Sequence, residues 1–201
     1  MSLKVEYKIT VLGDEGVGKH SFINSLAENL RSSVGSRHSH IGLDIIEYNF
    51  SKKIDEDLVE FFIKFLIISG QERNNEATKI IYKDINGFFI FFDVNNEETF
   101  NCINIWEDLI KENSNKKDHL IAIVGNKINN NRIIKLEDIE NHIKDKNYLY
   151  YENKNGSEKE IVTTFIEEIY KRNKNCEINT KTIQLEGVNE CHKCDCCCYI
   201  F

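Results

Sequence analysis

The 201-residue chain contains no proline, one methionine, one tryptophan and no long uncharged apolar run. No stretch approaches the roughly 18 consecutive apolar residues that a membrane-spanning helix needs. The beginning of the sequence also lacks the basic segment and apolar stretch that mark a secretory signal. We therefore expect a cytosolic domain without a membrane-spanning helix.

Basic charge is also in deficit, since 26 Lys and Arg stand against 33 Asp and Glu, for a formal net charge of −7. Nucleic-acid binding needs a basic face, so we expect no nucleic acid among the partners. Cysteine is scarce in the first 175 residues, which contain only Cys102. The other six are Cys176, Cys191, Cys194, Cys196, Cys197 and Cys198. This distribution argues against a disulfide scaffold.

Apolar runs of strand length alternate with segments of helical period, which is the pattern of a mostly parallel α/β sheet with helices on both faces. We expect six strands, at Val5 to Leu12, Asp44 to Phe50, Val59 to Ile68, Phe88 to Phe92, Leu120 to Val124 and Tyr148 to Tyr151. Only a polar turn separates the second strand from the third. These two strands should form an antiparallel hairpin at one edge of the sheet.

The expected helices run from Lys19 to Leu30, Glu72 to Lys83, Glu97 to Glu112, Leu136 to Lys144 and Glu158 to Lys171. The last one carries an apolar stripe and should cover the sheet. After Lys174 the composition turns polar without a clear period. We therefore expect a folded domain over residues 1–174 and a flexible tail over residues 175–201.

A glycine-rich loop, Gly13-Asp-Glu-Gly-Val-Gly-Lys19, follows the first strand and opens the first helix. Such a loop points backbone N–H groups and the positive end of a helix at a phosphate, and the lysine adds a point charge. The alternative is a plain glycine turn, which the strand-loop-helix context disfavours. The candidate binding residues are Gly13, Glu15, Gly16, Val17, Gly18, Lys19, His20 and Ser21.

Three further motifs lie at the carboxyl ends of expected strands, where open α/β sheets bind ligands. They are Gly70-Gln71-Glu72-Arg73, Asp93 and Gly125-Asn126-Lys127-Ile128-Asn129. Ile41-Gly42-Leu43-Asp44-Ile45 and Thr99-Phe100 with Trp106 complete the set. With the phosphate loop, these motifs make the segment from Tyr7 to Tyr170 resemble the Rab family of the Ras superfamily of small GTPases.

The resemblance implies the P-loop small GTPase fold, GTP or GDP as ligand with Mg²⁺, and a membrane-anchored switch in vesicle trafficking. The partners it implies are trafficking effectors, exchange and activating factors, and chaperones for prenylation and membrane extraction. It also implies nucleotide contacts from Gly70, Asn126, Lys127, Asn129, Asn153 and Lys154, and a water-positioning role for Gln71. The corresponding effector surface comprises Ile41, Gly42, Ile45, Leu66 and Tyr82.

The magnesium positions of the family are altered in this chain. The family uses the hydroxyl after the loop lysine, a threonine of the first switch and an aspartate at the end of the third strand. Here these positions hold His20, His40 and Ile67. Mg²⁺ prefers oxygen ligands in octahedral geometry, so we expect ordinary magnesium coordination to be lost. Two alternatives stay open for the histidines: His20, His38 and His40 gather a softer metal such as zinc, or they mark a degenerate site.

Guanine recognition is altered as well, because Asn129 replaces the family aspartate that accepts two guanine N–H bonds. An amide faces one of these donors with its own donor, a mismatch of about 1 to 3 kcal/mol. We expect a weakened guanine preference. The family's Ser-Ala-Lys loop becomes Glu152-Asn153-Lys154. Glu15 either repels a terminal phosphate or points to solvent.

The last four residues, Cys198-Tyr199-Ile200-Phe201, form a box typical of prenylation, and Cys196 and Cys197 offer further lipid sites. Two lipid chains anchor stably where one binds marginally. We expect lipidation at Cys196, Cys197 and Cys198, which would place the protein on the cytoplasmic face of intracellular membranes, with a cytosolic pool. The alternative is a zinc site built on Cys191 and Cys194.

Two functions remain open from sequence. The first is a Rab-like GTP-binding switch in trafficking with hydrolysis that is very slow or absent, because phosphoryl transfer depends on metal-assisted charge stabilisation. The alternative is a pseudo-GTPase adaptor that recruits partners at membranes without a nucleotide cycle. A nucleotide kinase is disfavoured, since no basic lid or second phosphate-binding segment is visible.

Overall fold

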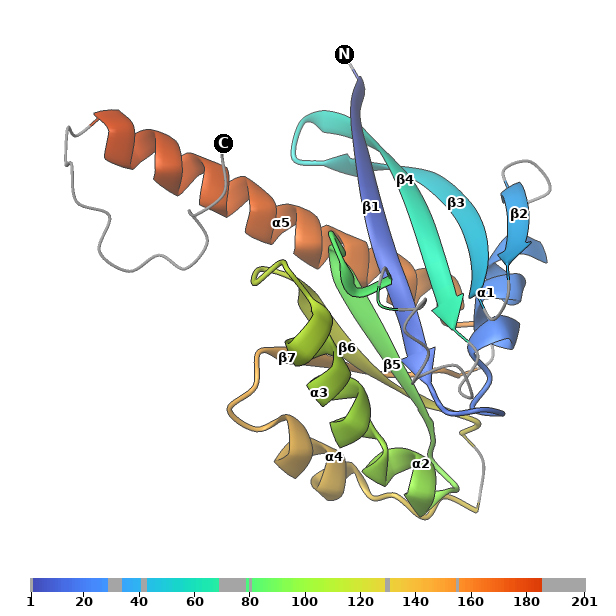
Figure 1. The fold of residues 1–201 in the computed structure, drawn as a ribbon. Helices are drawn as coiled ribbons and strands as arrows, with labels where there is room; N and C mark the ends of the chain where they lie inside the picture. The colour runs from blue at the N-terminus through green and yellow to red at the C-terminus, as the bar shows by residue number, and fades with distance from the viewer. Residues whose placement is uncertain are drawn as a thin grey trace.

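The protein, represented by a computed structural model, forms a single seven-stranded sheet with helices on both faces (Figure 1). The structure describes residues 2–28, 34–40, 43–68, 79, 81–128, 131–154 and 156–185, without the side chains of residues 2, 27, 28, 34–40 and 175–185. The strand order is β2-β3-β4-β1-β5-β6-β7. The predicted α/β fold class is confirmed.

The strands are β1 (Ser2–Gly13), β2 (Val34–His40), β3 (Leu43–Ile54), β4 (Asp57–Ile68), β5 (Gly87–Asp93), β6 (Leu120–Asn126) and β7 (Tyr148–Glu152). All six predicted strands are present, and β3 and β4 form the expected antiparallel hairpin. Strand β2 is an addition that pairs antiparallel with β3 at the edge of the sheet. Its sequence, VGSRHSH, lacks the apolar alternation by which a strand is recognised.

The helices are α1 (Lys19–Glu28), α2 (Glu97–Asn101), α3 (Ile103–Asn113), α4 (Leu136–Ile143) and α5 (Glu158–Leu185). The expected helix from Glu97 to Glu112 is divided at Cys102, and α5 continues past the predicted domain boundary at residue 174. Most of the helix expected from Glu72 to Lys83, and the tail from residue 186, lie outside the described residues. Within the described part of the chain, no helix is both long and apolar enough to cross a membrane.

The neighbouring parallel strands β5 and β6 are buried along almost their whole length. Parallel strands covered on both faces read as continuous apolar runs, which explains the sequence GFFIFFD of β5. Phe89 and Phe91 belong to the cluster beneath α1 and α5. Phe88 and Phe92 belong to the opposite cluster with Trp106 of α3. In Figure 1, α3 accordingly lies in front of the sheet and α5 behind it.

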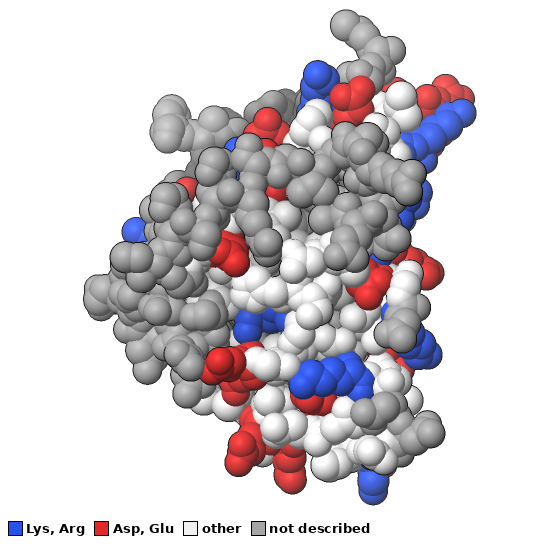
Figure 2. Space-filling view, turned by 90° about the vertical axis from the view of Figure 1, so that its right-hand side faces the viewer, with Lys and Arg blue, Asp and Glu red and all other residues white. Residues whose placement is uncertain are grey.

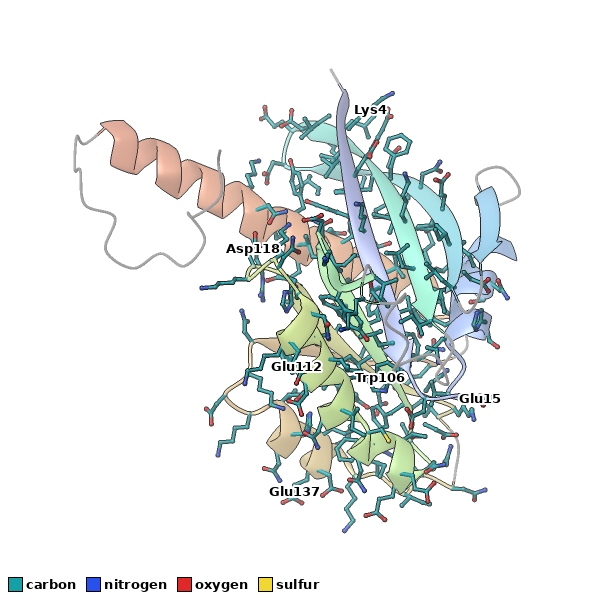
Figure 3. The ribbon with its side chains drawn as sticks, in the orientation of Figure 1. Lys4, Glu15, Trp106, Glu112, Asp118 and Glu137 are labelled. Atoms are coloured by element: carbon teal, nitrogen blue, oxygen red, sulfur yellow. The ribbon has the colours of Figure 1, made fainter. Side chains whose placement is uncertain are left out.

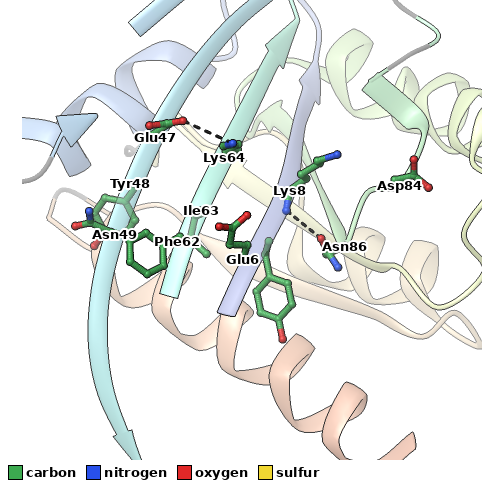
Figure 4. A pocket seen from close by; sticks show the side chains of 11 residues that line it. Glu6, Lys8, Glu47, Tyr48, Asn49, Phe62, Ile63, Lys64, Asp84 and Asn86 are labelled. Carbon is green, nitrogen blue, oxygen red and sulfur yellow. Dashed lines mark hydrogen bonds and ion pairs between the residues drawn. The ribbon is translucent and has the colours of Figure 1, made fainter. Parts of the chain in front are cut away.

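The outer face of β1, β3 and β4 carries a groove of about 400 Å³ (Figure 4). It is lined by Glu6, Tyr7, Lys8, Glu47, Tyr48, Asn49, Phe62, Ile63, Lys64, Asp84 and Asn86. The groove lies over the middle of β1, whereas the phosphate loop follows the end of that strand. On the face shown in Figure 2, Lys and Arg side chains are interspersed with Asp and Glu.

Replacing Phe165 by alanine tests the layer beneath α5. The ring is fully buried and packs against Phe89 with 4.4 Å between ring centroids. We expect the free energy of unfolding, measured by urea denaturation, to fall by about 3–5 kcal/mol. The control Ile133→Ala truncates a side chain that is 57% exposed, and its effect should stay within about 0.5 kcal/mol. Similar losses in both variants would contradict this packing.

Candidate functional site

The phosphate loop lies between the end of β1 and the start of α1, and glycine is required at two of its positions. Gly13 and Gly18 have φ of +133° and +94°. A Cβ atom on Gly13 would lie 2.4 Å from the carbonyl oxygen of Phe91, and one on Gly18 would lie 2.3 Å from Nδ2 of Asn126. The loop is therefore held in close contact with the ends of β5 and β6.

Lys19, the first residue of α1, is buried in this loop with only 4% of its surface exposed. Its Nζ donates hydrogen bonds to the backbone carbonyl oxygens of Gly13 at 2.6 Å and Asp14 at 2.7 Å. Desolvation lowers the pKa of Lys19 to about 8, and the carboxylates of Asp14 and Glu15 partly oppose this shift. Backbone carbonyls of the loop therefore hold the ammonium group of Lys19 at the place where a phosphate is expected to bind.

Helix α3 supports the loop from one side. The indole Nε1 of Trp106, a residue that is 1% exposed, donates to Oδ1 of Asp14 at 3.2 Å. The side chain of Glu15 is exposed, at the outer end of the loop (Figure 3). Of the two orientations considered for Glu15, the structure shows the one toward solvent.

Asn126 joins the phosphate loop to the ends of two strands. Its Nδ2 donates to the carbonyl oxygen of Val17 at 2.7 Å, and its Oδ1 accepts from Nδ2 of Asn153 at 3.0 Å and from the backbone N–H of Lys127 at 2.9 Å. The side chain is almost fully buried. Three segments that are distant in sequence therefore meet at one amide.

Lys127 has a left-handed backbone with φ of +60°, and its Nζ lies 2.7 Å from Oδ2 of Asp93 at the end of β5. Burial alone would raise the pKa of Asp93, but hydrogen bonds from Lys127 and Asn95 hold it below its usual value. Asn95 also donates to the carbonyl oxygen of Lys127 at 2.8 Å. This network fixes the turn that follows β6.

The predicted loop Glu152-Asn153-Lys154 lies beside this turn, but its three residues make different contacts. Asn153 bonds Asn126, whereas Glu152 forms an ion pair with Arg132 and accepts a hydrogen bond from the hydroxyl of Tyr150. The hydrogen bonds from Arg132 and Tyr150 outweigh the effect of burial and keep the pKa of Glu152 low. Lys154 is exposed, with its Nζ 3.8 Å from Glu152.

Comparison with known proteins agrees with this geometry. Residues 8–185 match the model of the Ras family. The chain belongs to the Ras family. It is 29% identical over 143 residues to Ras-related protein Rab-26 of Bos taurus, covering 70% of this chain and 54% of that protein. For Ras-related protein Rab-37 of Mus musculus the identity is 29% over 133 residues, with coverages of 65% and 57%. For Ras-related protein Rab-11B of Dictyostelium discoideum it is 33% over 120 residues, with coverages of 60% and 51%.

These matches confirm the predicted family, with Rab proteins as distant relatives. The chain spans about half the length of the curated relatives it matches.

The positions that would hold magnesium in a Ras-family protein do not fit this ion. Nε2 of His20 lies 3.0 Å from Oδ2 of Asp44, and Ile67 is 1% exposed within the core. An imidazole and an aliphatic chain do not supply the oxygen ligands that Mg²⁺ prefers. Among the described residues, no three His, Cys, Asp or Glu side chains are grouped so that they could hold a metal. The side chains of His38 and His40 lie outside that set, so the zinc alternative stays a prediction.

Several other predicted residues lie outside the described part of the chain: Ile41, Gly42, Gly70, Gln71, Asn129, Cys196, Cys197 and Cys198. Of the predicted effector surface, Ile45 and Leu66 are half-buried neighbours on β3 and β4. Tyr82 is 1% exposed and stacks on Phe88, so in this structure it is a core residue and offers no surface. Ser21 is exposed on α1.

Sequence reasoning missed two residues of this site. Asp44 was noted as part of a family motif, but not as the partner of His20. Strand alternation could have shown that it faces away from Ile45. No pattern marks Arg132, which reaches Glu152 from the segment before α4.

Alanine at Gly18 and at Gly16 separates crowding from backbone strain in the phosphate loop. Both glycines have positive φ, but a Cβ on Gly16 would have no neighbour within 4 Å. We expect Gly16→Ala to lower the free energy of unfolding by about 1–2 kcal/mol through strain. Gly18→Ala should cost about 1–3 kcal/mol more, because it displaces Asn126 from Val17. Equal losses in urea denaturation would show that the contact with Asn126 is not important.

The buried ammonium of Lys19 predicts a pH dependence of stability in the nucleotide-free protein. Between the folded pKa of about 8 and the ordinary value of 10.5, the unfolded chain binds the extra proton, so this group makes the protein more stable as pH rises. The unfolding free energy of wild type minus that of Lys19→Met should therefore rise with pH in this window, by up to about 1.4 kcal/mol per pH unit. A constant difference would contradict the burial of a charged lysine.

Proposed function

We propose that this chain is a Rab-like nucleotide-binding protein of vesicle trafficking that hydrolyses GTP very slowly or not at all. The observation that carries the proposal is a contrast within one site. The loop, Lys19 and Asn126 form one hydrogen-bonded unit, which supports nucleotide binding, whereas His20 and Ile67 do not offer the oxygen ligands that Mg²⁺ prefers.

The proposed ligands are GTP and GDP, with a weakened guanine preference. Lys19 and the loop N–H groups would bind the phosphates. Asn126 would hold the loop against the turn that carries Lys127 and Asn129, and Asn153 would support Asn126 from β7. Asn129 supports only a weak preference, since its amide cannot accept two guanine N–H bonds.

Slow hydrolysis follows from the chemistry of phosphoryl transfer. In this reaction a bound metal stabilises the charge that develops on the transferred phosphoryl group. In this chain Lys19 supplies a positive charge at the phosphate loop, and Gln71 would position water. Without metal-assisted charge stabilisation, the attack of a positioned water on the phosphate lacks several kcal/mol of transition-state stabilisation.

Action at intracellular membranes is supported by the Rab relatives and by the tail cysteines. Lipids on Cys196, Cys197 and Cys198 would anchor the protein to the cytoplasmic face. Trafficking effectors, exchange and activating factors, and prenylation and extraction chaperones are the proposed partners. Ile45 and Leu66 would contribute apolar surface to an effector contact.

Calorimetric titration with GTP, GDP, XTP and ATP, followed by single-turnover hydrolysis of labelled GTP, tests this function. We expect guanine nucleotides to bind with little preference over XTP, and hydrolysis to stay near the uncatalysed rate. Lys19→Met should weaken binding about tenfold or more, because a charge-assisted phosphate contact is lost. Rapid magnesium-stimulated hydrolysis would contradict the proposal. Failure to bind any nucleotide would favour the adaptor that works without a nucleotide cycle.

A further inference from the structure

A hollow of about 510 Å³ lies between α2 and α4, two helices at the same end of the domain in Figure 1. Each helix lines it with residues at positions i, i+3 and i+4, which share one helical face. Each face presents a carboxylate, an amide and an aromatic ring: Glu97, Asn101 and Phe100 on α2, and Asp138, Asn141 and His142 on α4. Ile134 completes the lining, and we call this hollow the α2–α4 pocket.

The carboxylates of the α2–α4 pocket are not neutralised by the residues around them. No Lys or Arg is among the residues that line it, and in the described part of the chain Glu97 makes no ion pair. Oδ2 of Asp138 accepts only the backbone N–H of Lys135, at 3.2 Å. His142 and Lys146 both bond Glu107 of α3, at 2.8 Å each, and not the pocket carboxylates. The pocket is therefore complementary in charge to a cation.

The aromatic rings narrow the choice of cation. The rings of Phe100 and His142 pack edge to face with 5.7 Å between centroids and 61° between planes. The side chain of Phe100 is only partly buried. A guanidinium stacks on aromatic rings, and its planar N–H donors bond carboxylates and amide oxygens at the same time. The pocket offers all three kinds of partner, so an arginine side chain fits it better than a compact ammonium.

Exposed apolar side chains beside the pocket indicate that the arginine belongs to a protein. Ile133 and Leu136 flank the lining residue Ile134, and at 57% and 50% they are the most exposed large apolar side chains among the described residues. Apolar surface next to a hollow with polar groups is typical of an interaction site. We propose that the α2–α4 pocket binds an arginine that a partner protein presents beside an apolar residue.

This docking site is separate from the proposed nucleotide site. None of the residues that line it belongs to the phosphate loop or to the network of Asn126. The proposal therefore does not rest on nucleotide binding.

Fluorescence anisotropy of labelled peptides with the full chain tests the proposal. The probe is the end-blocked peptide Ser-Leu-Arg-Leu-Ser, and in the control peptide citrulline, a neutral analogue of the same shape, replaces arginine. We expect the arginine peptide to bind about tenfold more tightly, because citrulline cannot make charge-assisted contacts. A third peptide with glycine in place of both leucines should bind about fivefold more weakly than the probe, since it buries less apolar surface.

A pair of double variants separates the pocket from the net charge of the protein. Glu97→Gln combined with Asp138→Asn should weaken binding of the arginine peptide about tenfold and leave the citrulline peptide unaffected. Asparagine keeps an acceptor for the N–H of Lys135, so α4 should stay folded by circular dichroism. The control, Glu112→Gln combined with Asp118→Asn, removes the same charge at and beyond the C-terminal end of α3 and should change affinity by about twofold or less (Figure 3).

The contrary results are distinct. No binding of the probe, equal affinity for the arginine and citrulline peptides, or equal losses in the two double variants would overturn the proposal. Equal affinity for the leucine and glycine peptides would overturn the protein partner and indicate a free cation as the ligand. Nucleotide titration of the same samples shows separately whether the proposed function holds.

Discussion

The close approach of the phosphate loop to the ends of β5 and β6 is the constraint on which the rest of the site depends. Gly13 lies against the carbonyl of Phe91 and Gly18 against the amide of Asn126, with no room for a Cβ atom at either contact. This approach lets Asn126 bond Val17, and Asn126 in turn connects to Asn153 on the far side of β6. A loop held at two glycines thus sets the position of Lys19 relative to Asn126 and Asn153, which belong to the proposed nucleotide site.

The same constraint is compatible with the proposed combination of nucleotide binding and slow hydrolysis. Lys19 is held by carbonyls of the loop itself, so its position does not depend on an ion. His20 and Ile67 lie outside this hydrogen-bonded unit, and one bonds Asp44 while the other packs into the core. The identities of these two residues therefore do not disturb the loop, which supports the proposal of a protein that binds nucleotide and hydrolyses it slowly.

Much of the fold follows from the sequence, because the strands are apolar runs and the phosphate loop has a fixed spacing. Strand β2 escaped prediction because its residues are polar and its pairing comes from β3, a tertiary effect that no local pattern carries. The burial of Tyr82 was also missed, since its side chain is compatible with either surface or core when only the sequence is known. At the site, glycine and lysine positions were predictable, whereas the partners of His20 and Glu152 depend on how distant segments meet.

The most direct test of the account is the nucleotide content of the protein as purified, measured by chromatography after denaturation. The account predicts close to one purine nucleotide per chain, retained after dialysis against a chelator. Protein that contains no nucleotide, or that loses it entirely when magnesium is removed, would contradict the claim that the phosphate loop works without its metal ligands.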